Sequence, residues 1–168
     1  MSKRVFSLIC AVSCSLLWGT AFVAQDMGMD YIGPYTFSAV RLALGFITLL
    51  PFFFIFELKK IKNSKLSIKV ITGYLFLLGF FLAGGNIFQQ ISLIYTDVAN
   101  SAVFTVLYVV IVPIIAYFLF SKKIHNSVWP SVLMCLVGGL FLSELGNLRV
   151  RFGDSLVVVG AFFWAFHI

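Results

Sequence analysis

Apolar residues fall into six long runs separated by short polar segments. Four runs exceed 20 residues, and they are Val5–Gln25, Tyr35–Phe56, Val70–Tyr95 and Val98–Phe120. Val128–Ser143 is shorter, at 16 residues, and has Pro130 in its first turn, where a helix tolerates proline. A sixth run extends from Ser155 to Ile168. A helix needs about 20 residues to cross a bilayer core, so the pattern predicts five complete transmembrane helices and a truncated sixth.

Two other interpretations of these runs fail. A membrane β-barrel needs alternating strands of about ten residues, and these runs do not alternate. The first run follows Lys3 and Arg4, as a signal peptide would, but its apolar stretch exceeds the usual length of about 7–15 residues and more spans follow. The predicted fold is therefore an all-α polytopic helical bundle.

Composition supports a membrane protein whose main surroundings are the lipid bilayer. The chain of 168 residues is 61% hydrophobic and 11% charged, with a mean hydropathy of +1.07. Soluble domains carry about 25% charged residues, so this chain has too few charges to cover a soluble surface.

The distribution of basic residues predicts the orientation. With the N-terminus in the cytoplasm, nine Lys and Arg residues lie on the inner side: Lys3, Arg4, Lys59, Lys60, Lys62, Lys65, Lys69, Lys122 and Lys123. Only Arg149 and Arg151 lie outside, and Arg41 is embedded. This bias satisfies the positive-inside rule and predicts a multi-pass protein of the plasma membrane with a cytoplasmic N-terminus.

The net charge of +6 does not require a nucleic-acid partner. The basic segment ELKKIKNSKLSIK could bind nucleic acid or calmodulin, but a cytoplasmic loop that orients two helices explains it more simply. Cys10, Cys14 and Cys135 lie within spans, and His125 stands alone in a loop, so we expect neither a metal site nor a cofactor.

Polar and small residues share one face on several predicted helices. The second run shows Ser38, Arg41, Gly45 and Thr48; the third shows Gly79, Ala83, Asn86 and Gln90; the fourth shows Ser101, Thr105 and Tyr108; the first, less clearly, shows Ser15, Trp18, Phe22 and Gln25. Helix packing can account for the small residues, because they let backbones approach.

Arg41 is the most informative polar residue, because it is a permanent cation in an apolar run. An Arg at the centre of a membrane helix costs about 2.5–3.5 kcal/mol. Arg41 lies six residues after Tyr35, about 9 Å along the helix, so it could snorkel towards the outer face. The alternative is a cation that lines a watered cavity and holds an anionic or zwitterionic solute or a partner helix. Either way, the side chain must face inwards.

Proline and glycine within the predicted helices, and the absence of an acidic residue at mid-depth, concern how a membrane protein of this kind could move and couple to ions. Pro113 predicts a bend in the fourth helix, and Gly84-Gly85-Asn86 should loosen the third. No Asp or Glu lies at mid-depth in the five complete helices, so ion coupling through these helices is not visible.

The end of the chain resembles its beginning. The segment SLLWGTAF (Ser15–Phe22) aligns with AFFWAFHI (Ala161–Ile168) and matches Trp18 to Trp164. An odd number of spans before the second copy would insert it in the opposite direction, as in the inverted repeats of many transporters.

Several blocks, in order, resemble EamA-type permeases of the drug/metabolite transporter superfamily. They are LLWGTAFVAQ, PYTFSAVRLALGF, GGNIFQQISLIYTDVANSAVFTVLYVVIVPIIAYFLF and VLMCLVGGLFL, while GDSLVVVGAFFWAFHI resembles the start of the family's second repeat. A turn of the Gly-Glu-Arg type usually follows the fourth helix, and Ser121-Lys122-Lys123 replaces it here. The resemblance implies ten helices in two inverted five-helix repeats, of which residues 1–145 form the first and 146–168 an outer loop and the start of the second.

The function predicted from residues and resemblance is transport of a small metabolite or drug-like solute by alternating access, with export as the expected direction. The predicted solute-binding residues are Arg41, Asn86, Gln90, Trp18 and Tyr108, with Pro113 as a bend. An intramembrane enzyme is disfavoured, because no His accompanies the serines of the complete helices. The remaining alternative is an accessory or nonfunctional fragment, which would need a second repeat or another copy of the chain to close a cavity.

Overall fold

The computed structural model describes residues 2–142 and 151–168, and within these ranges all the regular structure is helical. In chain order the elements are α1 (Lys3–Met29), α2 (Pro34–Phe52), the π-helix η1 (Phe53–Glu57), α3 (Leu58–Lys62), α4 (Ile68–Ser92), α5 (Val98–Thr105), α6 (Tyr108–Phe120), α7 (Val128–Leu142) and α8 (Phe152–His167). The predicted all-α fold class is confirmed. Four helical stretches are long and apolar enough to cross a membrane, whereas α7 and α8 are shorter apolar helices.

Local sequence explains where several helices begin. Ser2 and Ser67 precede α1 and α4, and each hydroxyl accepts a hydrogen bond from a backbone N–H three residues later, at 3.4 Å. Such N-caps satisfy amides that have no partner within the helix. Proline opens α2 at Pro34, where its missing N–H costs nothing.

The second predicted span continues past its expected end. Pro51 lies inside α2, and the π-helix η1 begins two residues later and leads into α3. Because proline cannot donate the usual backbone hydrogen bond, a local change of helical register beside it is physically reasonable. The span therefore reaches into the basic segment at Lys59 and Lys60 rather than ending at Phe56.

The fourth predicted span is interrupted. It divides into α5 and α6 at Val106 and Leu107. Here the amide of Leu107 donates to Phe104 O at 3.2 Å, a 3₁₀-type hydrogen bond that spans one residue fewer than the bond of an α-helix. Pro113 lies further on, within α6. The break thus precedes the proline by six residues, and a bend at Pro113 itself remains a prediction.

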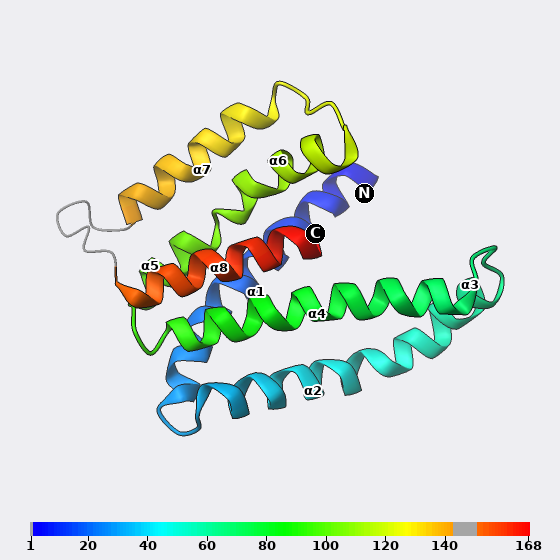
Figure 1. Cartoon of the computed structure of the whole chain (residues 1–168), viewed down its shortest axis with the longest axis horizontal. Helices are drawn as coiled ribbons and strands as arrows, with labels where there is room; N and C mark the ends of the chain where they lie inside the picture. Colours follow the sequence, from blue (N-terminus) through cyan, green and yellow to red (C-terminus); the bar gives the residue numbers. More distant parts are fainter. Residues whose placement is uncertain (1, 143–150) are drawn as a thin grey trace.

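The two ends of the bundle, which can be followed in Figure 1, carry different sets of charged residues. The N-terminus, α3 with its following loop, and the α6–α7 loop lie towards the right of the view, and these segments carry the basic residues assigned to the inner side. The α1–α2 turn and the α4–α5 loop lie at the opposite end. There Asp26, Asp97 and Arg151 line one hollow. The segments assigned to the inner side therefore lie at one end of the bundle, and those assigned to the outer side lie at the other. Arg149 and Glu144, also assigned to the outer side, lie outside the described residues.

Helix α8 lies against α4, α5 and α6 and is the most deeply buried helix described (Figure 1). Glycines allow this close packing. A Cβ on Gly84 would lie 2.2 Å from the Phe163 ring, and one on Gly85 would lie 3.0 Å from Trp164 Nε1. Helix α4 runs unbroken through both glycines. Gly84 and Gly85 therefore make room for α8 without interrupting α4.

The surface is apolar and the interior is comparatively polar. Large apolar side chains are exposed along α1, α2 and the first half of α4, as a lipid-facing surface requires. Among the described residues, buried polar side chains outnumber buried hydrophobic ones, ten against six. This polar interior is where a site must be sought.

Candidate functional site

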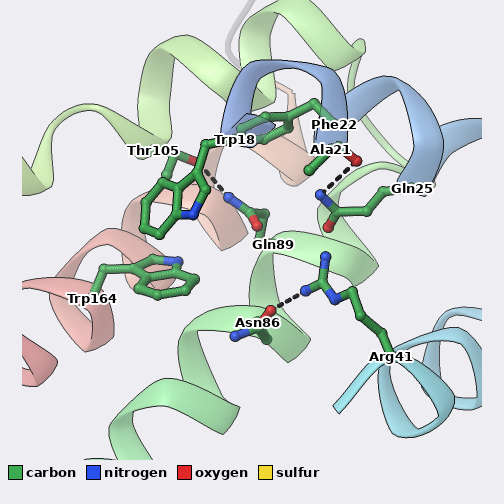
Figure 2. A pocket seen from close by; sticks show the side chains of 9 residues that line it. All are labelled: Trp18, Ala21, Phe22, Gln25, Arg41, Asn86, Gln89, Thr105 and Trp164. Atoms are coloured by element: carbon green, nitrogen blue, oxygen red, sulfur yellow. Dashed lines mark hydrogen bonds between the residues drawn. The ribbon is translucent and has the colours of Figure 1, made fainter. Parts of the chain in front are cut away.

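A cavity of about 260 Å³ lies between α1, α2, α4, α5 and α8 (Figure 2). It is lined by Trp18, Ala21, Phe22, Gln25, Arg41, Asn86, Gln89, Thr105 and Trp164. Its volume is slightly below the range of about 300–1,000 Å³ that is usual for ligand sites. Each described long helix except α6 and α7 contributes to the wall, so the cavity exists only in the assembled bundle.

Arg41 reaches from α2 towards α4, where its guanidinium donates a hydrogen bond to Asn86 Oδ1. Asn86 is held in turn, because its Nδ2 donates to Leu82 O at 2.8 Å. The Arg41 guanidinium carbon also lies 5.9 Å from the centre of the Phe37 ring, within cation–π range. The cation therefore faces the bundle interior and is held by neutral groups.

A second set of hydrogen bonds links α4 to α5. Gln89 Nε2 donates to Thr105 Oγ1 at 3.0 Å, and the Thr105 hydroxyl donates to Ser101 O at 2.8 Å. Across the cavity, Gln25 Nε2 donates to Ala21 O at 3.0 Å, while the buried Oε1 of Gln25 has no partner among the described residues. The cavity thus presents amide groups as well as the guanidinium.

Two indole rings form the apolar wall. The centroids of Trp18 and Trp164 lie 5.6 Å apart with their planes inclined at 55°. Trp164 is 8% exposed, and its Nε1 has no hydrogen-bond acceptor among the described residues. The site combines a cation, several amides and a tilted aromatic pair.

The structure brings three of the five predicted binding residues together. Arg41, Asn86 and Trp18 line the cavity. Gln90 is fully buried outside the lining, and both its amide atoms lack partners among the described residues. Tyr108 opens α6 and is partly exposed, also outside the lining. A role in solute binding stays a prediction for all five.

Gln89 is the lining amide that the sequence pattern did not single out. A helical face that contains Asn86 continues at either the third or the fourth following residue, and glutamine occupies both positions. Only the packing of α8 and α5 against α4 decides that Gln89 faces the cavity. Trp164, by contrast, could be singled out from the sequence, because the internal repeat aligns it with Trp18.

A separate polar cluster joins α8 to the α4–α5 loop. Asp154 is 2% exposed, and its carboxylate accepts hydrogen bonds from Thr96 Oγ1 at 2.5 Å and from the Arg151 amide at 2.8 Å. At the surface, Arg151 forms an ion pair with Asp97 at 2.6 Å. These contacts fix the first turn of α8.

Among the described residues, no three His, Cys, Asp or Glu side chains are grouped so that they could hold a metal ion.

Long apolar helices around a polar cavity define the chain as a polytopic helical membrane protein. A family model for EamA-like transporters matches residues 5–144, and the chain belongs to this family.

Two curated relatives agree with this assignment. The chain is 27% identical over 166 residues to an uncharacterized transporter of Archaeoglobus fulgidus, a match that covers 99% of the chain and 49% of that protein. It is 27% identical over 157 residues to the uncharacterized transporter YoaV of Bacillus subtilis, covering 91% of the chain and 52% of that protein. The chain thus spans about half the length of these relatives. No solved structure matches it significantly.

Proposed function

We propose that this chain forms part of a carrier that exports a small metabolite or drug-like solute across the plasma membrane by alternating access, with its N-terminus in the cytoplasm. The observation that carries the proposal is the cavity that five helices build around Arg41, Asn86 and Gln89. A cation within the membrane-spanning part of a protein is costly and is usually retained for a function. Export is the direction implied by the family resemblance.

The contact between Trp18 and Trp164 supports a two-repeat arrangement. These residues align in the internal repeat, and their ring centroids lie 5.6 Å apart. Equivalent residues of two inverted repeats can touch only near the axis that relates the repeats. We therefore propose that residues 1–145 form one repeat, that 146–168 begin the second, and that the solute site lies at their junction.

A cavity-filling substitution tests the proposal. Ala21 lines the cavity on α1, whereas Ala11 is exposed on the same helix, so Ala21→Phe and Ala11→Phe make a matched pair. The protein expressed from its full reading frame would be reconstituted into liposomes loaded with a metabolite extract of the expressing cells. Mass spectrometry would follow which solutes leave. Vesicles of known orientation would give the direction.

We expect Ala21→Phe to lower solute efflux at least about tenfold, because the phenyl ring occupies the space that the solute needs. Ala11→Phe should retain the wild-type rate, and both variants should elute as single species in detergent. Efflux no faster than from protein-free liposomes would overturn the proposal, as would equal rates for the two variants.

A further inference from the structure

We propose that the cavity selects a small solute whose recognition group is a carboxylate and whose body is flat and apolar. This inference rests on the proposed function, because it names the substrate class of the same cavity. It follows from three properties of the lining: its charge, the geometry of its cation and its aromatic wall.

The charge of the lining is positive and has no counter-ion among the described residues. Arg41 is the only ionisable side chain of the nine that line the cavity. The two ion pairs found in the described part of the chain are Lys60–Glu57 and Arg151–Asp97, and neither involves Arg41. The acceptor that Arg41 does have, Asn86 Oδ1, is neutral. A bound anion would supply the missing negative charge in a place where water screens it poorly.

The cation is suited to a carboxylate in particular. A guanidinium presents parallel N–H groups that match the two oxygens of a carboxylate, and Asn86 accepts from only one of the terminal nitrogens. Asn86 and Phe37 fix the orientation of the group from two sides. A phosphate dianion would normally require more than one cation, and the lining offers one.

The opposite wall favours a flat apolar body. The ring centroids of Trp18 and Trp164 lie 5.6 Å apart with their planes at 55°, and Phe22, four residues after Trp18 on α1, also lines the cavity (Figure 2). Aromatic rings prefer such tilted or offset contacts with another ring. Indole faces also attract cations, but a cation here would share a small cavity with Arg41 and be repelled by it. The two walls together select an aromatic or flat apolar carboxylate.

Three probes of almost equal size isolate the charge. Phenylacetate, 2-phenylethanol and phenethylamine share one ring and a two-carbon side chain but are anionic, neutral and cationic at pH 7. Binding of radiolabelled phenylacetate would be measured to the full-length protein in nanodiscs of neutral lipid, with the other two compounds as competitors. The variants would be Arg41→Gln, Arg41→Lys and, as a matched control, Arg4→Gln, which changes an exposed arginine at the start of α1.

We expect saturable binding of phenylacetate that the neutral and cationic probes displace at least about tenfold less well. Arg41→Gln should weaken binding about ten- to hundredfold, as expected for loss of hydrogen bonds to a charged group. Arg41→Lys should weaken binding by an intermediate factor, because lysine keeps the charge but lacks the parallel N–H groups of the guanidinium. Arg4→Gln should bind as the unmodified protein does.

Several results would overturn the inference: no saturable binding of phenylacetate, better binding of phenethylamine, or binding that Arg41→Gln leaves intact. Failure of the proposed function would appear in a different measurement. Phenylacetate would then bind in an Arg41-dependent manner, while the liposome assay showed no efflux of any solute. Efflux of cationic solutes alone would overturn the substrate class and leave the carrier function standing.

Discussion

At Gly153, α8 lies close to backbone atoms of another segment, and Gly153→Ala tests how tightly that helix is packed. A Cβ at this position would lie 2.8 Å from Ser92 O, 2.8 Å from Thr96 N and 2.8 Å from Thr96 Cβ. These atoms belong to the end of α4 and the loop that follows it. Two of them are backbone atoms, so no rotamer change can relieve the overlap.

The expected change in the free energy of unfolding of Gly153→Ala combines two opposing effects. Overpacking in a close-packed interior costs about 1–3 kcal/mol, and contact with backbone atoms favours the upper part, about 2–3 kcal/mol. Alanine regains about 0.5–1 kcal/mol over glycine in a helix. The net destabilisation is therefore about 1–2.5 kcal/mol.

Thermal unfolding of the detergent-solubilised protein measures this loss, with the monodisperse fraction after heating as the signal. For a protein of this size, 1 kcal/mol corresponds to about 2–4 °C, so Gly153→Ala should lower the midpoint by about 2–10 °C. Gly79→Ala on α4 is the control, because a Cβ there would meet nothing within 4 Å. Its midpoint should stay unchanged or rise.

Equal midpoints for Gly153→Ala and Gly79→Ala would refute the argument, since they would mean that α8 does not approach α4 as closely as the structure shows. Gly160→Ala provides a graded comparison. Its nearest neighbours would lie at 3.4 Å, an ordinary contact distance, so its midpoint should fall between those of the other two variants.

Two further predictions concern the polar cluster at the start of α8. Asp154→Ala should destabilise the protein by about 1.5–3 kcal/mol, because it leaves the buried Thr96 hydroxyl and a backbone amide without their acceptor. A double-mutant cycle with Thr96→Val should show non-additive losses of thermal stability. Additive losses would exclude the hydrogen bond between the two side chains. Arg151→Ala should cost less than about 1 kcal/mol in the same assay, because its ion pair with Asp97 is largely exposed; a larger loss would mean that the pair is part of the buried cluster.

Much of the candidate site could be predicted from Arg41 and its surroundings. A permanent cation within an apolar run must face the interior, and the amide at Asn86 shares the polar face of the third span. The structure joins these two residues by a hydrogen bond. The choice between Gln89 and Gln90 could not be predicted, because both lie at helical spacing from Asn86 and only the neighbours of α4 distinguish them.

Local breaks in the helices were harder to predict than the helices themselves. The bend expected at Pro113 stays a prediction, whereas the sequence pattern gave no sign of the interruption at Val106 and Leu107 or of the π-helix η1 after Pro51. A proline removes one hydrogen bond, but packing determines where the backbone departs from regular geometry. Gly84 and Gly85 likewise serve the approach of α8, which no property of α4 alone reveals.

The sequence by itself determined the class of protein, the approximate positions of the spans and the separation of basic from acidic ends. These follow from the cost of placing polar groups in lipid, which acts on each segment separately. Only the tertiary structure decided that α8 packs on α4, that Trp18 meets Trp164, and that Gln25, Arg41 and Gln89 surround one cavity. Lipid solvates apolar helix faces equally well, so hydropathy cannot choose among helix neighbours, and close packing and hydrogen bonds between helices make that choice.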